Sequence, residues 1–270
     1  MALTLSPSSL ASEHSTVRKS SVTVRNPLNA GMNPEMTAST PGVSPDRRWA
    51  GYYRAGAISI IVAGILVLIT LPLIPLLIPS LAPSSVQSGL TSIQSQSLLF
   101  GTTWGIYLVS DLLYLIAFPA LYFALRQANR TVTLIAAIFN MVFVAVDVGV
   151  DIPLRLSLIG LSNSYVSTSG DNQAAYLATG QLTMDLANLT ALVATFLQFS
   201  AIILVSYAIL KSQTFKKSTG YAGIVSGVFG LLFIPTFVVG SMLSGIFNIG
   251  GFVFLVAWSI LVGYKLYKLS

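Results

Sequence analysis

The chain has 270 residues, of which 54% are hydrophobic and only 8% are charged. Ordinary soluble domains carry about 25% charged residues, so this composition excludes a typical soluble protein and indicates an integral membrane protein. The formal charge of +6 does not indicate nucleic-acid binding, because the basic residues are scattered between apolar segments and form no patch with interleaved aromatic side chains.

Residues 1–46 are a polar N-terminal segment, rich in Ser, Thr, Pro and Asn. It holds no apolar stretch long enough for the core of a signal peptide. Its composition predicts a disordered cytoplasmic tail. Because the composition changes sharply after this segment, translation could begin at Met1, Met32 or Met36, and the intact mass of the natural protein would distinguish these starts.

The first apolar segment, about residues 57–78, is the first predicted transmembrane helix. At 1.5 Å per residue it spans about 33 Å, which is enough to cross the hydrocarbon core of a bilayer. Pro72, Pro75 and Pro79 crowd its second half, and they predict a kink or an early end of the helix.

The connection that follows, residues 80–97, carries no charged residue. Within it, Val86, Leu90 and Ile93 recur at helical spacing among Ser and Gln. This pattern fits a short amphipathic helix on the membrane surface, and a flexible neutral loop is the equal alternative.

Two further apolar segments, about residues 103–125 and 131–152, are separated only by residues 126–130. A turn this short predicts a helical hairpin whose two legs lie side by side. After Pro153, a stretch rich in Ser, Gly and Asn predicts a connection that ends at Asp171.

Residues 172–210 have a helical pattern over about 58 Å, which is longer than a bilayer is thick. Either this helix projects from the membrane, or Gly180 separates a surface segment from a fourth span of about 186–210. The fifth and sixth spans are predicted at about 220–239 and 245–264.

The fifth predicted span opens with four glycines spaced 3, 4 and 3 residues apart, so that they share one face of the helix. They are Gly220, Gly223, Gly227 and Gly230. Small residues at this spacing let the backbone of a neighbouring helix approach closely in lipid. We therefore expect a helix-packing surface, with a ligand-binding groove as the alternative.

The basic residues predict the topology. Of the 14 Lys and Arg residues, 13 lie in or beside the N-terminal segment, in the turn at 126–130, in the connection at 211–219 or at the C-terminus, and Arg155 is the exception. The positive-inside rule then places both termini in the cytoplasm. The sequence thus predicts an all-α protein, in which the tail of residues 1–46 precedes a six-helix transmembrane domain of residues 47–270.

Polar residues interrupt the third predicted span, where Asn140, Asp147 and Asp151 fall within about 40° of one another on a helix. A carboxylate that faces lipid costs roughly 2.5–3.5 kcal/mol, so this stripe should face other helices. Other spans bring polar residues to a similar depth in the outer half of the membrane. The predicted polar cluster consists of Asp111, Asn140, Asp147, Asp151, Arg155, Asp185 and Asn188.

Arg155 can pair with one of these acids, which leaves the others uncompensated. They can be protonated, can bond to tyrosines such as Tyr107, Tyr114 and Tyr176, or can hold a cation in an outward-facing cavity. The last case predicts a small transporter or sensor for a cation, a proton or a cationic small molecule. The alternative is a non-catalytic scaffold or accessory subunit, whose partners besides the lipid bilayer are other membrane proteins or a second copy of the chain.

An intramembrane enzyme that uses Asp111 and Asp147 as a carboxyl pair is the least favoured alternative. The Gly-x-Gly-Asp motif of intramembrane aspartyl proteases is missing, and neither HExxH nor a phosphate-binding glycine-rich loop occurs. Cysteine is absent and the one histidine, His14, lies in the tail, so no zinc, copper or haem site of the usual kind is expected. We expect no catalytic activity, no metal and no tightly bound cofactor.

The most distinctive short motif is the turn Leu-Arg-x-x-Asn-Arg-Thr at residues 125–131. With four further segments, this turn resembles a prokaryotic family of six-span membrane proteins, the domain-of-unknown-function family 4386. The further segments are residues 50–53, 63–65, 134–140 and 220–231. The resemblance covers about residues 47–268, and it implies six spans and a bacterial or archaeal cytoplasmic membrane. It brings no established activity and no catalytic residues.

Overall fold

The structure is a computed structural model that describes residues 47–81 and 84–270. Every regular element in these two ranges is a helix, which confirms the all-α prediction. The predicted disordered tail, residues 1–46, lies outside the described residues, and so do the alternative starts Met32 and Met36.

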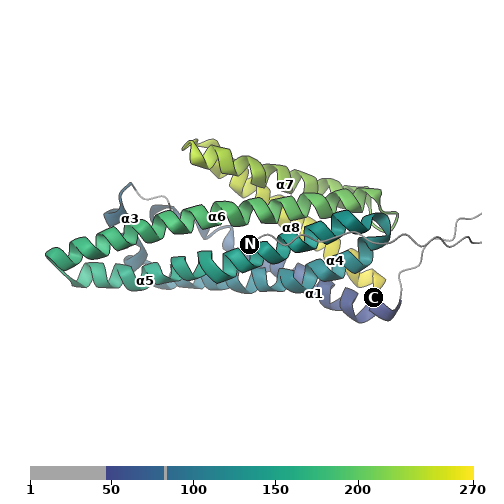
Figure 1. Ribbon diagram of the computed structural model, residues 1–270, viewed down its shortest axis with the longest axis horizontal. Helices are drawn as coiled ribbons and strands as arrows, with labels where there is room; N and C mark the ends of the chain where they lie inside the picture. Colours follow the sequence, from purple (N-terminus) through teal and green to yellow (C-terminus); the bar gives the residue numbers. More distant parts are fainter. Residues whose placement is uncertain (1–46, 82–83) are drawn as a thin grey trace, which may run out of the picture. The chain divides into compact units, whose positions relative to one another are not determined.

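The helices follow one another with short connections (Figure 1). In chain order they are η1 (Arg47–Trp49), α1 (Ala50–Thr70), α2 (Ile74–Leu81), α3 (Val86–Ser95), α4 (Ser97–Val146), the π-helix η2 (Asp147–Asp151), α5 (Ile152–Ser167), α6 (Asp171–Lys211), α7 (Lys217–Val238) and α8 (Leu243–Leu269). Five helical stretches within the described residues are long and apolar enough to cross a membrane, so the chain is a multi-pass membrane protein.

One of these five stretches, Ser97–Ser167, has 71 residues and reverses direction at Asn129. The backbone of Asn129 is extended, and its side-chain oxygen accepts a hydrogen bond of 3.1 Å from the Val132 N–H at the start of the returning leg. The amide of Asn140 on the second leg donates to the Tyr114 carbonyl on the first leg, which shows that the legs lie side by side. The hairpin therefore forms where the sequence predicts it. The number of membrane crossings stays a prediction, and it is six when each leg of the hairpin counts as one crossing.

Contacts between aromatic and basic side chains show which segments meet at one end of the helix bundle. The Arg126 guanidinium of the α4 turn lies 5.6 Å from the ring of Trp49, at the start of α1. The Arg54 guanidinium, in the first turns of α1, lies 6.0 Å from the ring of Tyr267, at the end of α8. The α5–α6 turn lies at the opposite end (Figure 1). These basic segments, which are predicted to be cytoplasmic, thus lie at the same end of the helix bundle. Which side of the membrane this end faces stays a prediction.

The first predicted span differs from the observed helices. Helix α1 begins at Ala50, earlier than the predicted start at residue 57, and it ends at Thr70 rather than at residue 78. A short turn then leads to the separate helix α2. Pro72 explains the break, because proline has no N–H to donate and its ring collides with the carbonyl four residues earlier.

The uncharged connection contains the predicted short helix, α3. Ser85 and Ser88 form a capping box: the Ser85 hydroxyl accepts from the Ser88 N–H at 3.2 Å, and the Ser88 hydroxyl accepts from the Ser85 N–H at 3.1 Å. Leu90 and Ile93 are fully buried among residues of α5 and α6. The short helix is thus confirmed and its apolar face packs on protein, while its position at the membrane surface stays a prediction.

Replacing Ser85 by alanine should loosen α3, because the first turn loses a hydrogen bond worth about 0.5–2 kcal/mol. Amide hydrogen exchange in detergent should become roughly 2- to 30-fold faster in the first turn of α3. Thr91→Ala is the matched control, since the Thr91 hydroxyl bonds only to carbonyls of its own helix. Equal exchange rates in the two variants would show that the capping box does not hold α3.

The predicted connection after Pro153 is also wrong, because α5 continues the helix to Ser167. The π-helix Asp147–Asp151 comes directly before this proline, and the Ile152 N–H donates to the Asp147 carbonyl five residues back. The wider π turn makes room for the proline ring inside a continuous helix. Likewise, α6 is one helix of 41 residues that does not break at Gly180, so the predicted fourth span, 186–210, is only its second part.

The four glycines of α7 face α6, and they leave no space for a side chain. A Cβ atom on Gly230 would overlap the Phe199 ring, and one on Gly223 would overlap the Ser206 hydroxyl and the Trp258 ring of α8. The same substitution at Gly220 and Gly227 would meet Leu210 and Ile203 of α6. This face of α7 is a close helix–helix contact. The helix itself begins at Lys217 and ends at Val238, and α8 begins at Leu243, close to the predicted bounds.

Candidate functional site

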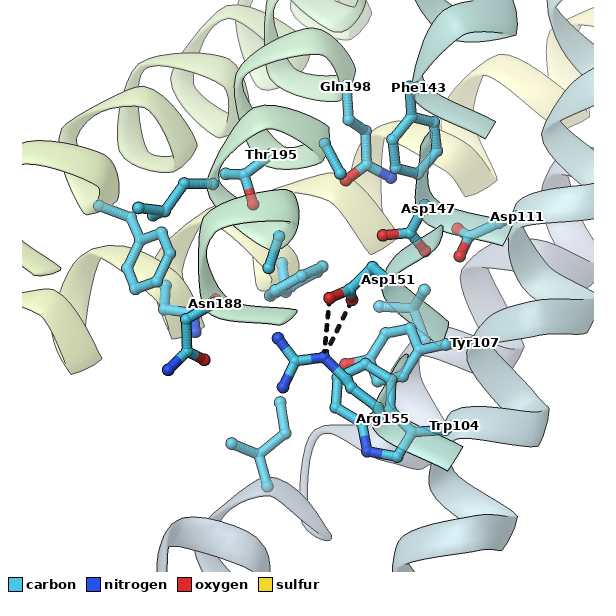
Figure 2. A pocket seen from close by; sticks show the side chains of 18 of the residues that line it. Trp104, Tyr107, Asp111, Phe143, Asp147, Asp151, Arg155, Asn188, Thr195 and Gln198 are labelled. Carbon is cyan, nitrogen blue, oxygen red and sulfur yellow. Dashed lines mark hydrogen bonds and ion pairs between the residues drawn. The ribbon is translucent and has the colours of Figure 1, made fainter. Parts of the chain in front are cut away.

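A cavity of ≈ 210 Å³ lies among the helices (Figure 2). It is lined by residues of α1, α2, α4, η2, α5, α6, α7 and α8. Its charged and strongly polar side chains are Asp111, Asp147, Asp151, Arg155, Asn188, Thr195, Gln198 and Asn248. Its aromatic side chains are Trp104, Tyr107, Phe143, Phe233, Phe237 and Phe252. The cavity is therefore an aromatic-walled space with several carboxyl groups.

The hairpin explains why two of the acids meet. Asp111 and Asp147 are each 18 residues from Asn129 along the chain, so the two legs carry them to the same height, about 27 Å from the turn. Figure 2 shows the two carboxyl groups facing one another beside the cavity. We call these two side chains the carboxyl pair.

Two buried carboxylates that face each other repel, and a shared proton or a cation relieves this repulsion. Asp111 is 4% exposed, and neither acid has an ion-pair partner among the residues that the structure describes. Tyr107 also lines the cavity, but no hydrogen bond joins its hydroxyl to an acid among the described residues. When the carboxyl pair holds a single proton, it therefore keeps one negative charge, and no cation among the described residues neutralises that charge.

The third acid, Asp151, is neutralised by Arg155. The Arg155 Nε donates to both carboxylate oxygens, at 2.9 and 3.1 Å, and the Thr190 hydroxyl donates to the same carboxylate at 3.2 Å. The guanidinium also donates to the Ala187 carbonyl at 3.4 Å and lies 4.3 Å from the centre of the Trp104 ring. Both charges are buried, so this ion pair joins α5 firmly to α6 and α4.

Gln198 on α6 is a mostly buried polar side chain that lines the cavity without a hydrogen-bond partner among the described residues. Only 9% of it is exposed. Figure 2 shows its amide directed toward the side of the cavity that holds Asp147. An unpaired buried amide costs about 1–3 kcal/mol, so its position favours a partner inside the cavity.

The structure brings five of the seven predicted cluster residues to this cavity: Asp111, Asp147, Asp151, Arg155 and Asn188. Asn140 is buried on the second leg of the hairpin, where it donates to the Tyr114 carbonyl, and it does not line the cavity. Asp185 is exposed and accepts a hydrogen bond of 2.8 Å from Gln181. Placing these two residues in the same cluster was wrong, because periodicity gives the face of a helix but not which neighbour covers it.

Asp185 lines a second cavity instead, of ≈ 310 Å³, together with serines at the start of α3. This second cavity shares Arg155, Asn188 and Phe237 with the first one. These three side chains therefore stand between the two spaces.

Sequence reasoning missed Gln198 and most of the aromatic wall. Asp185, Asn188 and Thr195 recur at helical spacing on one face of α6, and Gln198 follows three residues later, so extending this row of polar residues by one turn would have found it. The aromatic residues carry no comparable signal, because aromatic side chains that face lipid look the same in a membrane sequence. Among the described residues, no three His, Cys, Asp or Glu side chains are grouped so that they could hold a metal ion.

Residues 51–264 match a family described as a domain of unknown function, DUF4386. The chain belongs to the DUF4386 family. No curated protein and no solved structure matches it. Every residue that lines either cavity lies within the matched range, so the site of this DUF4386 protein belongs to the family domain.

Proposed function

We propose that this DUF4386 protein binds a proton or a cation in its acidic cavity and acts as a small transporter or a sensor. It carries out no catalysis and sits in the cytoplasmic membrane of a prokaryote, with six crossings and both termini in the cytoplasm. The ligand reaches the cavity from the outer side, since Asp111 and Asp147 lie about 27 Å along their helices from the turn at Asn129, and the second cavity lies between the inner cavity and α3.

The observation that carries this proposal is the carboxyl pair, Asp111 with Asp147. The cavity contains three carboxyl groups and one guanidinium. Arg155 neutralises Asp151, and one shared proton neutralises half of the pair, so one negative charge is left. In the low dielectric of a membrane protein, a charge without a partner is costly, and a bound cation or a second proton removes that cost.

A scaffold function is the second candidate, and the Asp151–Arg155 ion pair favours it. This pair is complete without a ligand and connects three helices, as expected of an acid whose role is structural. A scaffold would use the lipid-facing surface to bind other membrane proteins or a second copy of the chain.

Thermal unfolding of the purified full chain in detergent tests the proposal. The midpoint is measured across pH and in Na⁺, K⁺, Ca²⁺ and polyamine solutions, for the parent and for Asp111→Asn and Asp147→Asn. A ligand at 100 times its dissociation constant should stabilise the parent by about 2.7 kcal/mol, and both variants should lose this response.

Asp185→Asn is the matched control, because it removes an exposed carboxylate that lies outside the inner cavity. It should respond to pH and cations as the parent does. If no cation and no change of pH separates the parent from the Asp111 and Asp147 variants, the scaffold function replaces the proposed one.

A further inference from the structure

We infer that the ligand of this cavity is an organic monocation, an ammonium group on a small apolar body, rather than a bare metal ion. This inference rests on the proposed function and names the ligand class for the same site. Three observations carry it: the aromatic wall, the single uncompensated charge and the unpartnered Gln198 amide.

The wall of the cavity suits an apolar body. Trp104, Tyr107 and Phe143 come from α4, and Phe233, Phe237 and Phe252 come from α7 and α8, so three helices contribute aromatic rings to the wall. Hard cations such as Ca²⁺ take six to eight oxygen ligands, and among the described residues no three His, Cys, Asp or Glu side chains are grouped so that they could hold a metal ion. Organic ammonium groups are attracted to aromatic faces, and their hydrocarbon parts gain from leaving water.

The charges of the cavity select one positive charge on the ligand. Asp151 is already paired with Arg155 at 2.9 Å, so with one proton on the carboxyl pair a single negative charge faces the ligand. A dication would lack a second partner, and a neutral molecule would leave the charge unpaired. An ammonium group that donates an N–H to Asp147 completes the balance.

Gln198 fixes where the ammonium group sits. Only 9% of Gln198 is exposed, its amide has no hydrogen-bond partner among the described residues, and the amide points toward the Asp147 side of the cavity (Figure 2). The amide oxygen can accept a second N–H of the ammonium group. The volume of ≈ 210 Å³ is below the range of about 300–1,000 Å³ that holds drug-sized ligands, so the apolar body is small.

The experiment uses the full chain in detergent with 2-phenylethylammonium as the probe, and 2-phenylethanol, Na⁺ and Ca²⁺ as comparisons. Calorimetry gives the affinity, and tryptophan fluorescence reports occupancy, because Trp104 lines the cavity. Trp104→Phe shows which part of the fluorescence change comes from this side chain, since the chain has two other tryptophans.

We expect the ammonium probe to bind at least tenfold more tightly than the neutral alcohol, with a fluorescence change that is absent in Trp104→Phe. Gln198→Leu, which keeps a similar size, should weaken the probe about fivefold or more. Asp147→Asn should weaken it at least tenfold, and Asp185→Asn should leave it unchanged. The comparison of ammonium with alcohol on the parent does not depend on whether any variant folds.

Two results would overturn the inference and separate it from the proposed function. If Na⁺ or Ca²⁺ binds through the carboxyl pair and the ammonium probe does not, the ligand class is wrong while the proposed function stands. If the alcohol binds as tightly as the ammonium and no cation depends on Asp147, both the ligand class and the cation-binding function are wrong.

Discussion

Replacing Arg155 by alanine is expected to lower the free energy of unfolding by about 3–5 kcal/mol. The substitution leaves the Asp151 carboxylate buried without its cation, and this side chain is only 2% exposed. It also removes the hydrogen bond to the Ala187 carbonyl and the contact with the Trp104 ring, so α5 loses its polar connection to two neighbouring helices. Reversible unfolding with SDS in mixed micelles measures the loss.

The double variant Asp151→Leu with Arg155→Met separates loss of the ion pair from loss of packing. Replacing both charges by apolar groups of similar size is often neutral, so this variant should recover most of the stability that Arg155→Ala loses. If the double variant unfolds as easily as Arg155→Ala, the unpaired charge is not the cause. If Arg155→Ala is as stable as the parent, the ion pair contributes nothing measurable.

Gly230→Ala and Gly223→Ala are each expected to lower the free energy of unfolding by about 1–3 kcal/mol, because the new Cβ atom has no space. At Gly230 it would overlap the Phe199 ring, which is itself 2% exposed, and at Gly223 it would overlap the fully buried Trp258. Neither ring can turn away without moving its own neighbours, so α7 must shift from α6. The same SDS titration measures both variants.

Gly160→Ala is the matched control, because nothing lies within 4 Å of the added Cβ atom at this exposed position of α5. Alanine is a better helix residue than glycine by about 0.5–1 kcal/mol, so this variant should be slightly more stable than the parent. If Gly160→Ala and Gly230→Ala change stability by the same amount, backbone propensity explains the effect and the α6–α7 contact does not depend on the missing side chains.

Prediction from sequence worked best where local chemistry decides the structure. The turn at Asn129 and the start of α3 at Ser85 both depend on a polar side chain that caps a helix, and such signals lie within a few residues. The break that the prolines predict does occur at Pro72, whereas prediction failed at Pro153. A helix ends before Pro72, whereas the helix that contains Pro153 continues, because a π turn precedes this second proline. The sequence holds no clear sign of that turn.

The candidate site shows the same division. The stripe on the third predicted span correctly identified Asp147 and Asp151 as side chains that face protein. It treated them as one group, whereas the structure gives them different neighbours, Asp111 for Asp147 and Arg155 for Asp151 (Figure 2). Four residues separate the two acids, and the π turn between them changes the direction in which each points.

By itself, the sequence determined that this protein is helical and membrane-embedded, where its central hairpin turns, and that its acids must face other helices. These features follow from composition, periodicity and the cost of charge in lipid, which act within one segment of chain. Only the tertiary structure decided which acids meet, which of them is neutralised, and that aromatic rings and Gln198 close the cavity around them. Those contacts join residues on different helices, and helical periodicity sets the direction of a side chain without setting its neighbour.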